Sequence, residues 1–265
     1  MLDIHFSGGL LYPQLQALSV AELLGVAIAL VLGGMVKGVT GIGVPLVAMP
    51  ILTHFLPVKQ AVLLLSMPII LGNIPQALEG GKVLQTAREI AAPLVGTVIG
   101  NVVGVSVLIT LAAHDAQAVS GVMLIIAAAL MLLAPKFTLA PSLVKPVGFA
   151  LGFGAALMES IASVPGPLLA MYLIASGATG RVFTKRIAII LVVSVITLVL
   201  TFSSGAARAN GVDLAISAAA SLPAIAGMLL VRPLRDRLHP LAFRGVVLAF
   251  VLVAATQMIW KSGVL

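Results

Sequence analysis

Eight long apolar segments constrain the fold of this chain more than any other feature of its sequence. They cover residues 20–52, 59–79, 87–111, 117–134, 142–174, 181–201, 209–233 and 239–256. Segments of about 20 apolar residues are long enough to cross a bilayer as helices. Only 9% of the residues are charged, against about 25% in soluble domains, so the chain cannot build a water-facing surface. We therefore expect an all-α integral membrane protein, surrounded by the lipid bilayer, with multiple passes through the plasma membrane (the bacterial inner membrane).

The last four segments repeat the first four at a constant spacing. Their first residues are 20 and 142, 59 and 181, 87 and 209, and 117 and 239, so each pair is 122 residues apart. Local sequence agrees at one point, where PLVAM at 45–49 aligns with PLLAM at 167–171. Internal repeats of this kind recur in membrane transporters. The spacing predicts two membrane repeats, residues 1–135 and 136–265, within one transmembrane domain.

Segments 20–52 and 142–174 are too long for one helical crossing. Each has 33 residues, about 50 Å as a helix, whereas the hydrocarbon core is about 30 Å thick. Near its middle each carries helix-breaking residues, GVTGIGVP at 38–45 and SIASVPGP at 160–167. Glycine and proline free backbone groups that lipid cannot satisfy, so these breaks should line a cavity enclosed by protein. We expect two broken hairpins; a kinked, strongly tilted single span is the alternative.

Basic residues in the loops favour the hairpins. If all eight segments cross once, the basic residues divide eight to six between the two faces; if the long segments return to their own side, they divide eleven to three. The eleven include Arg181, Lys185 and Arg186, which are interpreted as orientation signals. Lysine and arginine collect on the cytoplasmic side, so the second arrangement is preferred. It predicts two inverted structural repeats, each a broken helical hairpin plus three transmembrane helices, with both termini outside.

Lys37 and Glu159 are exceptional charges, because they lie within apolar segments and away from the segment ends. They are 122 residues apart, so they occupy equivalent positions beside the two breaks. A charge at bilayer depth costs at least about 2.5–3.5 kcal/mol, so we expect it to be paired, to be hydrated or to serve the function of the protein. One interpretation is an ion pair that joins the hairpins. The other makes Lys37 the counter-charge of a bound anion and Glu159 a coupling or gating group, with the proton as coupling ion.

The residues after each break are typical of a helix start. Proline suits the first turn of a helix, so Val44-Pro45 and Gly166-Pro167 should begin two short half-helices. Their free N–H groups and positive dipole ends would then point into the cavity and favour an anion. The predicted substrate-binding residues are Lys37, Gly38, Thr40, Gly41, Gly43, Pro45, Ser160, Ser163, Gly166 and Pro167.

Other small and polar residues are interpreted mainly as packing. Asn73 and Asn101 are amides that either face the cavity or link helices. Gly96, Gly100 and Gly104 form a ridge of small residues, which is typical of a close helix contact. Together with the small size of the chain, this ridge suggests a homodimer.

The first break carries a longer motif. Residues 33–52, GGMVKGVTGIGVPLVAMPIL, resemble the glycine-rich signature of the sulfite exporter TauE/SafE family, also called toluene sulfonate uptake permeases. Residues 152–170 are similar to its weaker second repeat, and the size and duplicated organisation agree along the whole chain. The sequence departs from the pattern at Val44-Pro45, where many members have further glycine. The resemblance implies transport of sulfur-containing anions such as sulfite, sulfonates or sulfoacetate.

The leading hypothesis is a secondary transporter of such small anions. A channel or transporter for an unrelated small ion, and an accessory membrane subunit without transport activity, are the alternatives. An enzyme is not expected, because neither G-x-S-x-G nor H-E-x-x-H occurs. The chain has no cysteine, and its histidines lie outside the segments or at their ends, so we expect no metal and no cofactor. The basic residues form no patch with interleaved aromatics, which argues against a nucleic-acid partner.

Overall fold

The chain folds into a bundle of helices, and no strand occurs in the part that the structure describes. The computed structural model describes residues 9–40, 43–133, 138–204, 208–233 and 240–264. The helices are α1 (Tyr12–Gln16), α2 (Val20–Thr40), α3 (Val44–Leu52), α4 (Val58–Leu78), α5 (Val83–Glu89), α6 (Ala91–Thr110), α7 (Ala113–Leu133), α8 (Val144–Ala162), α9 (Gly166–Ala175), α10 (Gly180–Ser204), α11 (Gly211–Val231) and α12 (Pro240–Lys261), with a 3-10 turn at Pro141–Leu143. The all-α prediction is confirmed.

Eight helices within the described ranges are long and apolar enough to cross a membrane: α2, α4, α6, α7, α8, α10, α11 and α12. Their outer faces leave large apolar side chains uncovered, with Val20 76%, Leu222 70% and Val253 71% exposed. A soluble protein rarely exposes apolar surface on this scale, whereas lipid covers it without cost. The chain is a multi-pass membrane protein, as its sequence predicts.

The predicted segments match these helices to within five residues at their ends. Segment 87–111 is not continuous, because α5 ends at Glu89 and α6 begins at Ala91. Pro93 lies in the first turn of α6, where its missing N–H costs nothing; inside one continuous helix its ring would clash with the preceding turn. The segment predicted to begin at residue 117 begins at Ala113.

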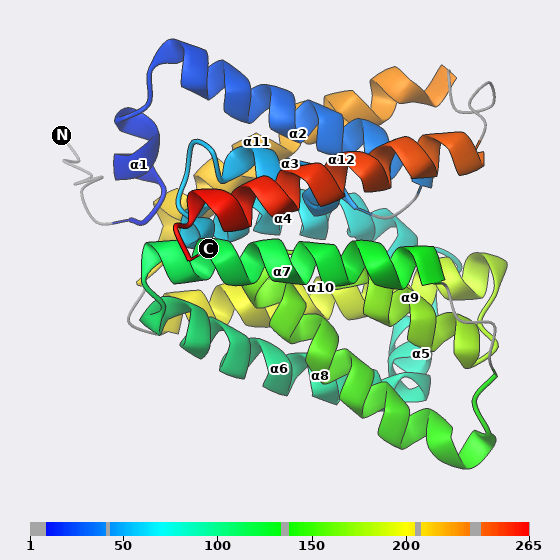
Figure 1. Cartoon of the computed structure of the whole chain (residues 1–265). Coiled ribbons are helices and arrows are strands. Elements are labelled where there is room, and N and C mark those ends of the chain that lie inside the picture. The colour runs from blue at the N-terminus through cyan, green and yellow to red at the C-terminus, as the bar shows by residue number, and fades with distance from the viewer. Residues whose placement is uncertain (1–8, 41–42, 134–137, 205–207, 234–239, 265) are drawn as a thin grey trace, which may run out of the picture.

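Both long segments are broken where the sequence predicts a break. α2 ends at Thr40 and α8 at Ala162, and α3 begins at Val44 and α9 at Gly166, so both breaks keep the 122-residue offset. The breaks lie past the predicted middle, because α2 has 21 residues and α3 has 9, while α8 has 19 and α9 has 10. Each short helix turns back toward the end of the bundle from which its long partner starts (Figure 1).

A left-handed residue helps to redirect the chain at each break. Gly43, just before α3, has a φ of 106°, which glycine adopts without a steric penalty. Ser163, just after α8, has a φ of 57°, and its N–H donates to the Glu159 carbonyl oxygen at 2.7 Å. This hydrogen bond satisfies one of the carbonyls left free at the end of α8.

The packing of the helices follows the predicted duplication. α2 packs on α11 as its counterpart α8 packs on α6, and α11 packs on α4 as α6 packs on α10. Counterparts also contact each other directly, α4 with α10 and α7 with α12. The division into the repeats 1–135 and 136–265 stays a prediction.

Counterpart helices also run in opposite directions in Figure 1, where α2 runs from left to right and α8 from right to left. The start of α2 and the end of α12 lie at the same end of the bundle (Figure 1). An inverted duplication predicts both features. The orientation of the halves in the membrane, and the number of complete crossings, stay predictions.

The glycine ridge of α6 packs against another helix of the same chain. A Cβ at Gly96 would collide with the Phe149 carbonyl oxygen of α8, and one at Gly100 would lie 2.5 Å from the Phe153 carbonyl oxygen. At Gly104 a Cβ would lie 2.7 Å from the Cβ of Ser160. The predicted close helix contact is therefore between α6 and α8. Since α8 covers the ridge, it gives no support to the predicted homodimer.

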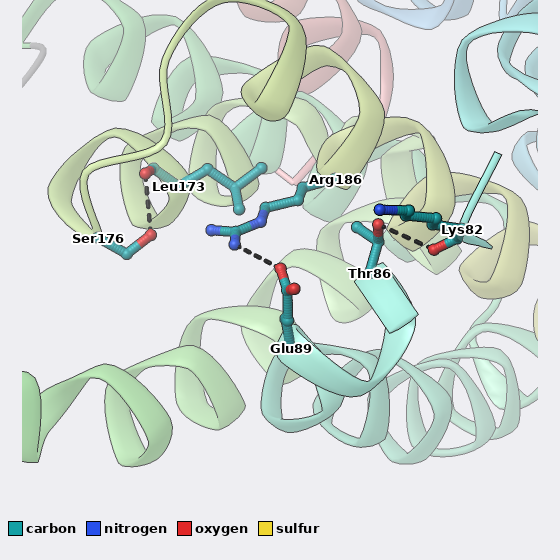
Figure 2. A network of polar contacts seen from close by, with 6 residues as sticks. All are labelled: Lys82, Thr86, Glu89, Leu173, Ser176 and Arg186. Atoms are coloured by element: carbon teal, nitrogen blue, oxygen red, sulfur yellow. Dashed lines mark hydrogen bonds and ion pairs between the residues drawn. The ribbon is translucent and has the colours of Figure 1, made fainter. Parts of the chain in front are cut away.

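Basic side chains near the start of α10 hold neighbouring helix ends together. Arg186 Nη2 lies 2.8 Å from Glu89 Oε2 of α5, as Figure 2 shows. Lys185 Nζ donates to the carbonyl oxygens of Glu79 and Gly81, just after α4. Arg181 forms a longer ion pair with Glu79, at 3.8 Å. The predicted orientation signals thus also connect α10 to the link between α4 and α5.

Candidate functional site

A small pocket, referred to below as the cavity, lies between the two breaks. Its first wall consists of break residues, namely Gly43 to Leu46 from one hairpin and Ser163 to Pro167 from the other. Its second wall is apolar and comes from α4, α7 and α10, through Ile69, Met131, Ile187 and Leu191. The polar side chains in the lining are Lys37, Asn73 and Ser163. The cavity is therefore an apolar space with one cationic group.

Two half-helices begin at this cavity. α3 begins at Val44 with Pro45 in its first turn, and α9 begins at Gly166 with Pro167 in its first turn. Neither helix has a side-chain cap at its start. The positive end of each helix dipole therefore faces the cavity without a protein side chain to neutralise it. The predicted half-helix starts are confirmed, and their geometry suits an anion.

Lys37 brings the only full positive charge to the described lining of the cavity. Its side chain is buried, with 8% exposed, and it extends from the last turn of α2 toward α4. A Cβ built on Gly72 of α4 would lie 3.1 Å from Lys37 Nζ. Across the described residues, no hydrogen bond or ion pair reaches this ammonium group. Because Lys37 lines the cavity, water or a ligand there can contact this ammonium group.

Asn73 adds an amide one residue after Gly72. It is 2% exposed, and its Nδ2 donates to the Ile69 carbonyl oxygen at 2.7 Å, within α4. That bond uses part of the amide's hydrogen-bonding capacity, because an asparagine has two donor hydrogens and a carbonyl acceptor. Asn73 therefore contributes a dipole to the cavity wall, in agreement with one of the two interpretations drawn from the sequence.

Glu159 lies in a buried polar cluster outside the cavity lining. Its Oε2 accepts hydrogen bonds from Asn101 Nδ2 of α6, at 3.1 Å, and from Ser194 Oγ of α10. Asn101 Nδ2 also contacts the Ser194 carbonyl oxygen at 2.9 Å, while Ser160 Oγ donates to Asn101 Oδ1 at 2.8 Å. All four side chains are at most 1% exposed. The cluster joins α6, α8 and α10 through a single carboxyl group.

No ion pair joins Lys37 to Glu159 in the part of the chain that is described. The ion pairs found there are His114–Asp115, Arg181–Glu79 and Arg186–Glu89. Glu159 instead has neutral donors on one oxygen, and its other oxygen, Oε1, is buried without a hydrogen-bond partner among those residues. The interpretation of the two charges as a link between the hairpins is therefore wrong for this structure.

Comparison with known proteins identifies the chain. The family model described as Sulfite exporter TauE/SafE matches residues 26–258, which include both breaks and all eight long helices in whole or in large part. The chain belongs to the sulfite exporter TauE/SafE family. No curated protein and no solved structure matches it. TauE/SafE membership confirms the resemblance seen in the sequence and makes the chain a membrane transporter of a family that handles sulfur-containing anions.

Within this TauE/SafE chain, seven of the predicted cavity residues meet at one place. They are Lys37, Gly43, Pro45, Asn73, Ser163, Gly166 and Pro167. Their roles in binding stay predictions, but the sequence grouped them correctly in space. This grouping could be predicted because most of these residues belong to the two breaks, or to the helical turn beside a break, and are therefore close together in the sequence.

Other predicted residues lie elsewhere. Gly38 packs on α11, where a Cβ would lie 2.5 Å from Val231 Cγ1. Thr40 Oγ1 donates to the Val36 carbonyl oxygen at 2.8 Å. Ser160 and Asn101 contact each other in the Glu159 cluster. Gly41 lies outside the described residues.

The sequence reasoning missed the apolar walls and Ser194. Isoleucine, leucine and methionine residues that line a cavity cannot be recognised in the sequence of a membrane helix, because the lipid-facing positions are apolar too. Ser194 had a weak signal, since it is 122 residues after Gly72 and therefore occupies the equivalent position in the other half.

Proposed function

We propose that this chain is a secondary transporter that binds a small sulfur-containing anion between its two broken hairpins. The observation that carries the proposal is Lys37, whose ammonium has no acceptor among the described residues and lines a cavity where two uncapped helices begin. Membership of the TauE/SafE family supplies the class of anion. We place the protein in the bacterial inner membrane.

The charge of the site favours a monovalent anion. Lys37 is the only full cation in the described lining, and the two helix ends add partial positive charges whose effect falls off within the first turn. A second full negative charge on the ligand would be balanced by these partial charges alone, against the apolar side chains of α4, α7 and α10. Hydrogen sulfite and singly charged sulfonates fit this balance better than sulfate does.

The apolar wall favours an organic group on the anion. Ile69, Ile187 and Leu191 face the same space as Lys37, so a ligand with a hydrocarbon part replaces water there while its sulfonate oxygens accept from the ammonium. Among the sulfur anions implied by the family, we therefore expect organic sulfonates to bind more tightly than sulfite.

Glu159 is proposed to carry the coupling proton. Its carboxyl group is buried, has neutral hydrogen-bond donors on Oε2 only, and accepts them from both halves of the chain, from Asn101 and Ser194. Protonation would remove its charge and change these hydrogen bonds. A proton gradient could then bias the conformation of the bundle.

A ligand screen followed by flux measurements tests the proposal. Purified protein in nanodiscs is heated with hydrogen sulfite, sulfate, thiosulfate, sulfoacetate, taurine, an alkyl sulfonate and acetate, because a bound ligand raises the melting temperature by mass action. We expect the largest rise with the alkyl sulfonate and the smallest with sulfate. In proteoliposomes, flux of the best ligand should saturate and follow an imposed pH gradient. Flux that does not saturate indicates a channel, and absence of both binding and flux contradicts the proposal.

A further inference from the structure

The buried charges of the two halves lie at equivalent positions but have different neighbours. Glu159 is 122 residues after Lys37, and Ser194 is 122 residues after Gly72. In the second half Ser194 donates a hydrogen bond to Glu159. In the first half the neighbour of Lys37 is Gly72, which has no side chain to offer.

A second side chain near Lys37 also offers no strong acceptor. Met228 of α11 lies beside Gly72, since a Cβ built on Gly72 would lie 3.4 Å from Met228 Cε and 3.1 Å from Lys37 Nζ. Around Glu159, by contrast, Asn101 and Ser194 both donate hydrogen bonds to the carboxyl group. Polar side chains thus contact Glu159, whereas a glycine and a thioether lie near Lys37.

From this contrast we infer that Gly72 and Met228 determine the specificity of the anion site by withholding protein acceptors from Lys37. The inference rests on the proposed binding of the anion at Lys37. Glycine has no side-chain acceptor, and the thioether sulfur of methionine is only a weak one. The ammonium can therefore form its strong hydrogen bonds only with a ligand. A serine at position 72, as at the equivalent position 194, or an asparagine at position 228 would compete with the anion.

Close helix packing does not account for Gly72. At Gly34 and Gly227, in the contact between α2 and α11, an added Cβ would collide with a carbonyl oxygen of the opposite helix. At Gly72 the atoms that a Cβ would meet are the ends of two flexible side chains, Lys37 Nζ and Met228 Cε. These can move aside, so the backbone leaves room for a small side chain. What such a side chain would change is the surroundings of the ammonium group.

The substitution Gly72→Asp tests the inference, because it places a carboxylate beside Lys37 Nζ. The internal ion pair should replace the anion and raise its apparent Kd at least about tenfold, equivalent to about 1.4 kcal/mol. Gly72→Leu has a similar size without an acceptor and should weaken binding less. Gly211→Asp is the matched control, because Gly211 is exposed at the start of α11 with open space around it. Binding is measured in nanodiscs by calorimetry with the sulfonate that stabilises the wild type most.

The outcomes separate this inference from the proposed function. If Lys37→Ala loses the anion but Gly72→Asp binds it as the wild type does, the inference is wrong and the anion site stands. If Lys37→Ala binds normally, the proposed site itself fails. Equal losses for Gly72→Asp and Gly72→Leu point to bulk rather than to an added acceptor and also overturn the inference. Should Gly72→Asp not insert, Met228→Asn replaces it, with Met228→Leu as its control; equal affinity of these two variants overturns the inference.

Discussion

Lys37 and Glu159 occupy equivalent positions in the two halves of the chain but lie in opposite surroundings. The ammonium of Lys37 faces the cavity and has no protein acceptor among the described residues, whereas the Glu159 carboxyl is held by Asn101 and Ser194. One charge is therefore available to a ligand, and the other is enclosed by helices α6, α8 and α10. The proposed function assigns anion binding to Lys37 and coupling to Glu159, and the predictions below test each part.

Removal of the Lys37 charge should weaken anion binding. Lys37→Ala leaves the anion in an apolar cavity with two helix ends alone, so we expect its apparent Kd to rise at least about tenfold, or about 1.4 kcal/mol. Lys37→Arg should restore part of the affinity, because the charge returns in a different geometry. Lys261→Ala, at the exposed end of α12, is the control. Wild-type affinity of Lys37→Ala would place the anion elsewhere.

Glu159→Gln should separate binding from coupling. The amide keeps the size of the side chain and an oxygen for Ser194 and Asn101, but it cannot take up a proton at this site. We expect the anion to bind as in the wild type, while accumulation driven by a pH gradient in proteoliposomes is lost. Glu22→Gln is the control, since Glu22 contacts Ser19 at an exposed helix start. Undiminished accumulation in Glu159→Gln excludes this carboxyl as the coupling group.

Asn101→Ala should destabilise the protein. The substitution leaves Ser160 Oγ without its acceptor and removes a donor from Glu159, both fully buried. Each unsatisfied buried group costs about 1–3 kcal/mol, so the melting temperature in detergent should fall clearly. Ser106→Ala on the same helix is the control, because Ser106 is exposed and contacts only its own helix. Similar melting temperatures for the two variants would argue against a tight cluster.

Gly96→Leu should prevent α6 from packing on α8. Its Cβ would collide with the Phe149 carbonyl oxygen and lie 2.9 Å from the Phe153 backbone nitrogen, and backbone atoms of a packed helix cannot move aside. We expect little monodisperse protein in size-exclusion chromatography. Gly154→Ala should behave like the wild type, since the nearest atom to its Cβ is Leu168 Cδ1 at 3.5 Å.

The inverted arrangement can be tested by labelling single cysteines, since the chain has none of its own. Cysteines at Lys82 and Arg181 should react from one face of the membrane, and cysteines at Arg208 and Lys261 from the other. Cysteines at Lys136 and Arg235, which lie outside the described residues, should react from the same face as Lys82. Reaction of the Lys136 and Arg235 positions from opposite faces contradicts the inverted model.

The sequence by itself determined the positions of the helices, the two breaks and the family. These features depend on local chemistry: apolar length predicts a crossing, and Gly43 and Pro45 end one helix and begin the next wherever the rest of the chain lies. The basic loop residues and the 122-residue spacing are likewise properties of the chain alone.

Only the tertiary structure decided what each buried polar group contacts. The contacts depend on the rotation of every helix about its axis, and a helix that is apolar on all sides does not reveal that rotation in its sequence. Lys37 and Glu159 looked like an ion pair by position, yet Ser194 and Asn101 bind the carboxyl because α10 and α6 present them there. The glycine ridge of α6 looked available to a second chain, but close backbone packing against α8 covers it.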